Sequence, residues 1–259
     1  MKSFSRFGLV TGAAGFLGKV HCESILENYD GLIMVDINKK EMSKNYESLK
    51  VKFKNKKIYQ LCIDLNKDQK FLKIKKLINK KNLFIRVLIN NACIDAKPDK
   101  SSKILNLESW NSEFNVGLKA PTILIDLLSK QMIKRKDGCI INIASDLSVI
   151  APNQKIYKNI YKNFKKPVTY SLIKHALVGL TKYYASDLAK FGITCNAISP
   201  AGVFNNQDKK FIKNLVSLIP MNRMAKKSDV KNLIDFLIND KQKFITGQNL
   251  LIDGGRTII

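Results

Sequence analysis

Short apolar runs alternate with longer helical patterns along almost the whole chain of 259 residues. Most of the runs carry consecutive apolar residues, which is typical of strands that are buried on both faces of a sheet. A strand, a helix and a strand in series predict βαβ units and therefore a parallel sheet. The expected strands are 7–10, 32–36, 58–63, 83–90, 139–144, 194–199 and 250–253, and the expected helices lie near 16–28, 39–50, 67–80, 108–135, 168–190 and 228–238.

We expect one domain over residues 1–259, because no Gly-, Pro- or Ser-rich linker divides the chain. Right-handed crossovers make such units a Rossmann-like, doubly wound parallel sheet of about seven strands with helices on both faces, and ligands bind at the carboxyl ends of its strands. The segment 148–167 has no strand pattern and ends at Pro167. We expect a long loop there, with one short helix at most, and loops of this length are usually functional or disordered.

Lysine dominates the charge of the chain. Its 45 Lys and Arg residues and 21 Asp and Glu residues give a net charge of +24, but only five of the 45 are arginine. Contacts to base edges and bidentate contacts to phosphates favour arginine. We therefore expect a solvated basic surface and no specific nucleic-acid partner.

The sequence has no features that indicate a membrane protein, a secreted protein or a metal-binding protein. No apolar run approaches the ~18 residues of a membrane span, and residues 1–18 predict a buried strand and turn instead of a signal peptide. The five cysteines are more than 30 residues apart, so no Cys-x-x-Cys pair exists and reduced thiols in the cytoplasm are expected. With only two histidines, we expect no metal site.

The segment TGAAGFLG at 11–18 joins the first expected strand to the first expected helix. Glycines at such a turn let the backbone approach a pyrophosphate at the helix N-terminus. Asp36 closes the next strand, 18 residues after Gly18, where a carboxylate accepts hydrogen bonds from ribose hydroxyls and repels a 2′-phosphate. The pattern predicts NAD, with NADP as an alternative because Lys39 and Lys40 follow closely. A turn that is rich in glycine only for tight packing is the competing interpretation.

Polar residues follow the third and fourth expected strands. Asp64 is placed either to reach an adenine amino group or to cap the next helix, for which Asp is a preferred residue. Asn90, Asn91 and Ala92 end the fourth strand. We expect these asparagines to brace the neighbouring strand ends and to line the cofactor groove.

A Tyr-x-x-x-Lys pair places both side chains on one face of a helix. The ammonium favours the phenolate and so lowers the pKa of the tyrosine from about 10. Such a phenol can exchange a proton with a carbonyl or an alcohol during hydride transfer. Three pairs match: Tyr46 with Lys50, Tyr161 with Lys165, and Tyr170 with Lys174. We favour Tyr170 and Lys174, because they follow Pro167, a favourable helix start, and open a long apolar helix that would hold an acid rigidly.

Two further polar residues are candidates for this chemistry. Ser145 follows the expected strand 139–144, where its hydroxyl can orient a substrate oxygen or merely cap the next turn. Asn115 falls within an expected helix, although asparagine is a mediocre helix former. One explanation is that it connects Lys174 to solvent.

Taken together, these pieces resemble the short-chain dehydrogenase/reductase family in its classical length. The resemblance rests on TGAAGFLG at 11–18, Asp36, NNAC at 90–93, Asn115, Ser145, YSLIK at 170–174, NAISPAGV at 196–203 and ITGQNLLIDGG at 245–255. It implies an NAD(P)-dependent oxidoreductase that interconverts a carbonyl and a secondary alcohol, with a catalytic tetrad of Asn115, Ser145, Tyr170 and Lys174. It also implies a homotetramer or homodimer.

The resemblance further implies a set of cofactor contacts, with Lys174 on the nicotinamide ribose and the turn at 200–203 at the nicotinamide end. The implied set is Gly12, Ala14, Gly15, Phe16, Leu17, Gly18, Asp36, Asp64, Leu65, Asn91, Ala92, Tyr170, Lys174, Pro200, Gly202 and Val203.

Two departures from the family pattern concern the substrate. The spacing Gly12-x-x-Gly15-x-x-Gly18 resembles the extended branch of the family, which handles nucleotide sugars. Ser145 and Tyr170 stand 25 residues apart, about twice the usual gap, and the excess is an insertion at 148–167. We expect this insertion beside the substrate cleft and a lid at 204–219.

The insertion carries five lysines that either clamp an anionic substrate or form a solvated loop: Lys155, Lys158, Lys162, Lys165 and Lys166. The favoured substrate is a sugar or nucleotide-sugar intermediate of surface-glycan biosynthesis. The alternatives are a 3-oxoacyl-carrier-protein-type reductase and a dinucleotide-binding protein without catalysis.

Overall fold

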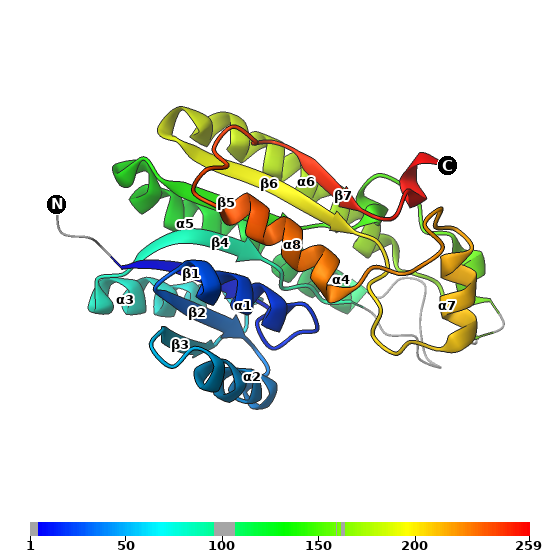
Figure 1. Ribbon diagram of the computed structural model, residues 1–259, viewed down its shortest axis with the longest axis horizontal. Coiled ribbons are helices and arrows are strands. Elements are labelled where there is room, and N and C mark those ends of the chain that lie inside the picture. The colour runs from blue at the N-terminus through cyan, green and yellow to red at the C-terminus, as the bar shows by residue number, and fades with distance from the viewer. Residues whose placement is uncertain (1–4, 96–106, 159, 162–163) are drawn as a thin grey trace.

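The computed structural model describes residues 5–95, 107–158, 160–161 and 164–259. Within them, seven strands form one parallel sheet in the order β3-β2-β1-β4-β5-β6-β7 (Figure 1). The strands are β1 (Arg6–Thr11), β2 (Gly31–Asp36), β3 (Lys57–Cys62), β4 (Phe84–Asn90), β5 (Gly138–Ile143), β6 (Ile193–Pro200) and β7 (Asn249–Ile252). Each lies at an expected strand, and the predicted doubly wound parallel sheet is confirmed.

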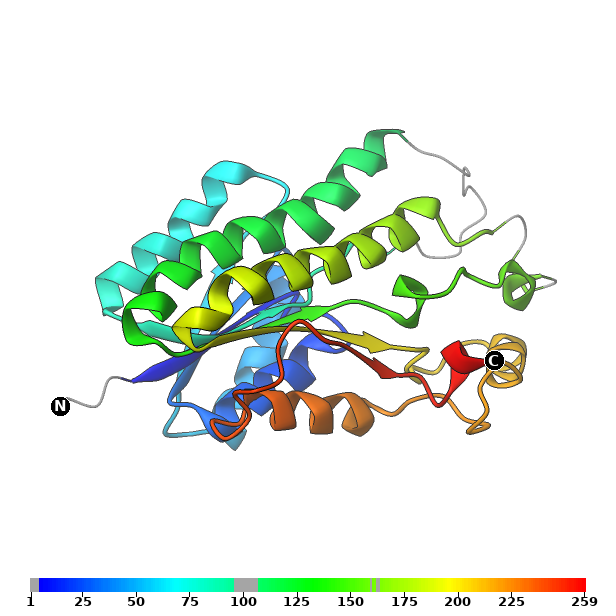
Figure 2. The ribbon, with the colours of Figure 1, turned by 90° about the horizontal axis from the view of Figure 1, so that it is seen from above.

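Helices cover both faces of this sheet, which Figure 2 shows edge-on between two layers. The helices are α1 (Gly18–Asn28), α2 (Lys39–Lys52), α3 (Phe71–Lys81), α4 (Leu107–Phe114), α5 (Ala120–Arg135), α6 (Val168–Leu188), α7 (Lys209–Val216) and α8 (Lys227–Ile238). Side chains of α3, α5 and α6 pack on one face, and those of α1, α2 and α8 pack on the other. None of the helices in the described part of the chain has the length and apolarity needed to cross a membrane.

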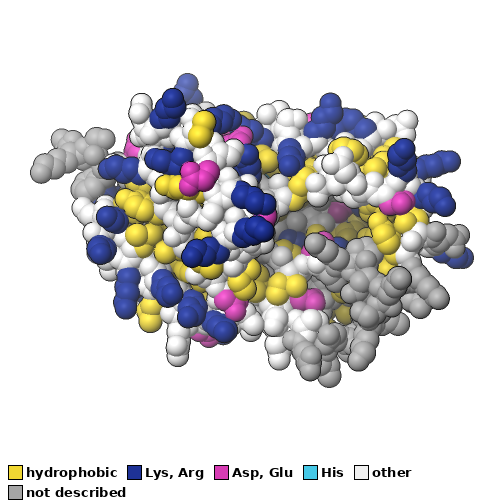
Figure 3. All heavy atoms as spheres, turned by 90° about the horizontal axis from the view of Figure 1, so that it is seen from below, with side chains coloured by type: hydrophobic (Ala, Val, Ile, Leu, Met, Phe, Trp, Pro, Cys, Tyr) yellow, Lys and Arg dark blue, Asp and Glu magenta, His cyan; other side chains and the backbone are white. Residues whose placement is uncertain are grey.

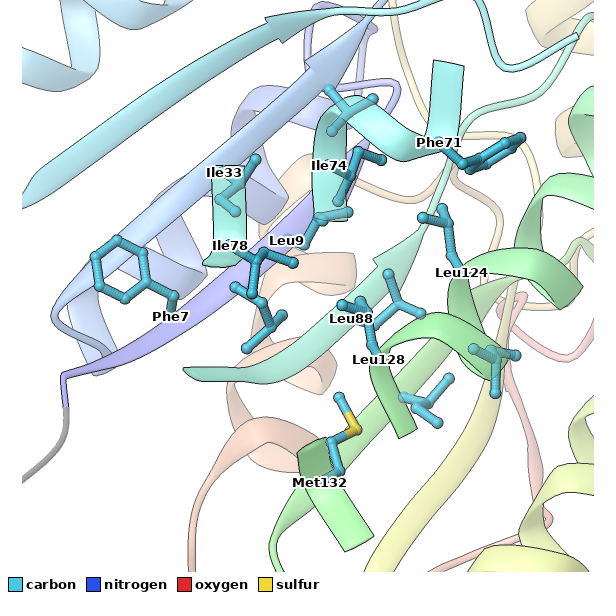
Figure 4. Close-up of a cluster of buried hydrophobic side chains, with 14 of the residues drawn as sticks. Phe7, Leu9, Ile33, Phe71, Ile74, Ile78, Leu88, Leu124, Leu128 and Met132 are labelled. Carbon is cyan, nitrogen blue, oxygen red and sulfur yellow. The ribbon is translucent and has the colours of Figure 1, made fainter. Parts of the chain in front are cut away.

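The consecutive apolar residues of the strands divide between two cores. In β1, Leu9 packs on the α3 and α5 side, while its neighbour Val10 packs on the α1 and α8 side. Figure 4 shows the first core, in which Ile74 of α3 and Leu124 of α5 meet the strands. Full burial of each such side chain contributes about 1.5–3 kcal/mol, so burial on both faces holds the sheet between its helices.

The expected helices differ from the observed ones in detail. The expected helix 108–135 is observed as α4 and α5, joined by one π-helical turn (η2, Asn115–Lys119). The expected helix 67–80 begins as a 3₁₀ turn (η1, Asp68–Lys70) before α3. Pro167 is the N-cap of α6, which agrees with its predicted role as a helix start.

The insertion is largely irregular, as expected: η3 (Asp146–Ser148) ends at its first residue, and its described part contains one short 3₁₀ helix, η4 (Gln154–Tyr157). The expected lid segment contains α7. An aromatic cluster connects the two segments, because the Tyr157 ring stacks on Phe211 of α7 at 5.6 Å and meets Phe164 edge-on at 4.9 Å.

A buried polar chain ties α6 to the centre of the sheet. The Asn90 amide of β4 donates to Asn142 Oδ1 of β5 at 2.8 Å, and the Asn142 amide donates to Thr181 Oγ1 of α6 at 2.9 Å. Thr181 in turn donates to the Leu177 carbonyl at 2.7 Å. Because buried donors are costly to leave unpaired, this series of hydrogen bonds fixes the position of α6 against β5.

Replacing Thr181 by Val should therefore destabilise the fold by about 1–3 kcal/mol, because the buried Asn142 amide loses its oxygen acceptor. Urea unfolding measures the change. Thr122→Val on α5, whose hydroxyl donates to the Leu118 carbonyl in a half-buried position, is the matched control and should cost less. Equal costs for the two variants would contradict the role assigned to Thr181.

Candidate active site

One cavity of about 910 Å³ lies at the carboxyl ends of β1, β2, β4, β5 and β6. It extends from the glycine turn to the insertion and α7, and Figure 3 shows a hollow on one face of the molecule. Lys and Arg side chains are scattered over that face, and some of them stand at the rim of the hollow.

Fifteen of the sixteen expected cofactor residues line this cavity. They are Gly12, Ala14, Gly15, Phe16, Leu17, Asp36, Asp64, Leu65, Asn91, Ala92, Tyr170, Lys174, Pro200, Gly202 and Val203. The sixteenth, Gly18, lies behind the turn, where a Cβ would stand only 2.1 Å from the Gly12 carbonyl oxygen. Gly18 therefore does not line the cavity, but its lack of a side chain permits the tight turn in which Gly12 and Gly15 line it.

Asn91 and His21 hold the glycine turn in place. Gly12 has a φ of +64°, which favours glycine. The Asn91 amide donates to the carbonyls of Thr11 and Gly12 at 3.0 and 3.1 Å, so the predicted bracing of a strand end is observed. Burial lowers the pKa of His21 to about 4, which keeps the imidazole neutral, and its Nε2 lies 3.1 Å from Asn91 Oδ1. His21 was not predicted, and nothing in the sequence distinguishes it from a core residue.

Two carboxylates stand at the far end of the cavity from Tyr170. Asp36 accepts hydrogen bonds from the backbone N–H groups of Ala14 at 2.9 Å and Asn38 at 2.8 Å. Asp64, two residues beyond β3, accepts from the N–H of Asn66 at 3.0 Å and also faces the cavity. The expected helix cap was wrong, because η1 and α3 have Lys67 and Lys70 as their N-caps, while Asp64 closes a local turn and still lines the groove.

Tyr170 and Lys174 lie one turn apart on α6, at the edge of the cavity. Lys174 is buried, and its Nζ donates to the Ile143 carbonyl at the end of β5 at 2.8 Å. The same Nζ lies 5.5 Å from the Tyr170 ring centroid. The other two Tyr-x-x-x-Lys pairs lie elsewhere: Tyr46 packs against the core on α2, and Tyr161 belongs to the aromatic cluster of the insertion.

Burial raises the pKa of Tyr170 well above its ordinary value, and the nearby carboxylate of Asp95 and thiol of Cys93 raise it further. A hydrogen bond with Ser145 acts in the opposite direction. The expected net lowering of the pKa of Tyr170 was therefore wrong for this arrangement, because desolvation dominates.

Ser145 follows β5 and belongs to a buried charged network that the sequence did not reveal. Its hydroxyl donates to Asp146 Oδ1 at 2.8 Å and caps the next turn by accepting from the Leu147 N–H at 3.2 Å. Asp146 Oδ2 forms an ion pair with Arg256, and both side chains are less than 10% exposed. The only sequence sign was the position of Asp146 directly after Ser145, and of Arg256 directly after Gly255 near the chain end.

Asn115 begins the π-helical turn between α4 and α5. Its amide donates to Asn66 Oδ1 at 2.8 Å, and its side chain is not among those that line the cavity. The expected role beside Lys174 stays a prediction.

The end of the cavity that lies away from the glycine turn is lined by residues of the insertion and of α7. Among the described insertion lysines, Lys166 lines the cavity, whereas Lys155, Lys158 and Lys165 are exposed. Lys162 lies outside the described residues. Asn205, Gln207, Phe211 and Leu215 of the expected lid also face the cavity.

Comparison with known proteins agrees with this architecture. A family model described as enoyl-(acyl carrier protein) reductase matches residues 12–257. The chain belongs to the short-chain dehydrogenase/reductase family, and the expected family membership is confirmed.

Relatives of similar length carry different names. An NAD-dependent glycerol dehydrogenase of Listeria innocua is 29% identical over 258 residues, covering 98% of this chain and 94% of that protein. A 3-oxoacyl-[acyl-carrier-protein] reductase of Buchnera aphidicola is 29% identical over 259 residues, covering 98% of each. The crystal structure of a short chain dehydrogenase from Leptospira borgpetersenii with bound NAD⁺ has a TM-score of 0.83 at 28% identity and covers 98% of this chain and 93% of that chain.

Replacing Arg256 by Met should destabilise the protein by about 3–5 kcal/mol, because it leaves the buried Asp146 carboxylate without its counter-charge. The double variant Asp146→Asn/Arg256→Met should lose less than Arg256→Met alone. Chemical unfolding of the two variants measures this.

The surface variant Arg223→Met is the matched control, because Arg223 also pairs with an aspartate, Asp229, and its side chain is half exposed. It should change stability little. A double variant as unstable as Arg256→Met would show that packing, and not the buried charge, sets the cost.

Proposed function

We propose that the chain is an NAD-dependent oxidoreductase that interconverts a secondary alcohol and a carbonyl, with Tyr170 as the general acid and base. The observation that carries this proposal is that the glycine turn, Ser145, Tyr170 and Lys174 line one cavity. A non-catalytic dinucleotide-binding protein would not need the last three together.

The lining of the cavity fits a dinucleotide. The glycine turn offers backbone at the N-terminal end of α1, as a pyrophosphate requires. Asp36 stands where ribose hydroxyls would be accepted, and Lys39 and Lys40 are exposed and do not line the cavity. These features favour NAD over NADP. NAD is also part of the name of the Listeria glycerol dehydrogenase.

Replacing Asp36 by Ala should reduce the ratio of kcat/KM for NAD to that for NADP by about tenfold or more, because a charged acceptor for the ribose is lost and a repulsion is removed. Steady-state kinetics with both cofactors measures the ratio. Lys39→Met should leave the ratio unchanged, and a large effect of this control would revive the NADP alternative.

A bound nicotinamide supplies the hydride donor or acceptor. For alcohol oxidation, the hydride leaves the carbinol carbon and the Tyr170 phenolate accepts the hydroxyl proton; reduction runs the same steps in reverse. Ser145 would orient the substrate oxygen, and Lys174 would hold the ribose. Asn115, at the π-helical turn, would connect Lys174 to solvent.

The raised pKa of Tyr170 sets an expected pH dependence. The phenol is protonated at neutral pH, so reduction has its acid there and loses it as the pH rises through the pKa. Oxidation needs the phenolate, so its rate should rise with pH across the alkaline range.

Tyr170→Phe should lower kcat by about 10²–10⁴-fold in both directions while NAD still binds.

Tyr161→Phe is the matched control for this experiment, because Tyr161 belongs to another Tyr-x-x-x-Lys pair and does not line the cavity. It should keep both the rate and the pH profile. Full turnover by Tyr170→Phe would refute Tyr170 as the acid.

A sugar, or a nucleotide-linked sugar of surface-glycan biosynthesis, is the substrate class that we favour. Polar groups of Asn153 and Asn205 and the rings of Tyr157 and Phe211 line the substrate end, a combination that suits hydroxyl-rich molecules. The glycerol dehydrogenase of Listeria is named for a polyol, which agrees with this choice.

A 3-oxoacyl-carrier-protein reductase is the second candidate. The Buchnera relative carries that name, and the positive surface would suit an acidic carrier protein. Turnover of polyols, sugars and nucleotide sugars against acyl thioesters separates the two, and reduction of thioesters alone would defeat the sugar assignment. We also propose that the protein is a homodimer or homotetramer, and light scattering tests this oligomeric state. A cytoplasmic location belongs to the same proposal.

A further inference from the structure

Lys166, near the end of the insertion, lies against the catalytic tyrosine. Its Nζ stands 3.9 Å from the Tyr170 ring centroid, nearer than the 5.5 Å of Lys174. Its side chain is only 10% exposed, and it lines the cavity. An ammonium in this position is held at the reacting end of the substrate site.

The partner of Lys166 is an exposed carboxylate. Nζ forms an ion pair with Asp95 Oδ1 at 2.5 Å, and the Asp95 side chain is 53% exposed. Because the carboxylate is half exposed, water and dissolved anions reach it and compete with it for the ammonium. Asp95 is therefore an exchangeable partner that a ligand anion can replace.

The other described cations of the cavity lack this freedom. Arg256 is paired with Asp146, and both are buried. Lys174 donates to the Ile143 carbonyl, and the proposed chemistry assigns it to the cofactor. Lys166 is thus the cavity cation that can meet a negative charge on the substrate.

We propose that Lys166 binds an anionic group of the substrate, a carboxylate or a phosphate, that displaces Asp95. Because the ammonium lies over the Tyr170 ring, the anionic group stands within a few bonds of the carbon that reacts. The substrate is therefore an acidic or phosphorylated hydroxy compound. This inference rests on the proposed function for the reaction, but the anion site itself can be tested without turnover.

Two variants should change anion binding in opposite directions. Lys166→Met should weaken binding of the anion by at least tenfold, because the ammonium is lost. Asp95→Asn should tighten it, because the internal competitor is neutralised. Lys166→Arg should restore part of the anion binding that Lys166→Met loses. Thermal unfolding of both Lys166 variants checks that each protein still folds.

The experiment is calorimetric titration of the NAD-loaded protein, at low ionic strength, with malonate and separately with inorganic phosphate. We expect one site per chain, and the anion that binds more tightly distinguishes a carboxylate from a phosphate ligand. Lys155→Met, an exposed lysine of the same insertion, is the matched control for non-specific binding and should behave as the unmodified protein.

Three results would overturn the inference. The first is that neither anion binds the unmodified protein. The others are that Lys166→Met binds the anion as tightly as the unmodified protein does, or that Asp95→Asn binds it no more tightly than the unmodified protein. NAD titration in the same samples separates the two proposals. Normal NAD binding with no anion effect would defeat only this inference, whereas absent NAD binding would defeat the proposed function.

Discussion

The parallel arrangement of β1, β4, β5 and β6 is the constraint on which the site depends. Carboxyl ends of parallel strands meet at one edge of a sheet, so groups far apart in the sequence, such as Gly12 and Tyr170, line one cavity. Thr11 and Asn91 bond directly across that edge. Lys174 bonds to the last residue of β5. With an antiparallel partner in place of any of these strands, its functional residues would lie at the opposite edge.

Burial sets the electrostatics of this edge more than any single charge does. The Tyr170 phenol is kept neutral by desolvation although Lys174 and Lys166 are both near its ring. The Asp146 carboxylate accepts the Ser145 hydroxyl with one oxygen, and Arg256 supplies a buried counter-charge to its other oxygen from the C-terminal segment. The C-terminal segment is thereby part of the support of Ser145, the proposed catalytic serine.

The fold and much of the cavity were predictable because they depend on local patterns. Apolar runs and glycine positions located all seven strands and the turn at residues 12–18. Position along the chain favoured Tyr170 over Tyr46 and Tyr161, and of these three tyrosines it is Tyr170 that lines the cavity. The pairs of Asp146 with Arg256 and of Asp95 with Lys166 were not predictable, because each joins residues separated by 110 or 71 positions. The direction of the Tyr170 pKa was missed for a similar reason, since burial is a property of the folded chain.

A crystal structure of the protein with bound NAD would test the central claim most directly. The account predicts the pyrophosphate at the turn of residues 12–18, the adenosine ribose at Asp36, and the nicotinamide beside residues 200–203 with the Tyr170 hydroxyl facing it. A dinucleotide bound outside this cavity, or a Tyr170 hydroxyl directed away from the nicotinamide, would contradict it.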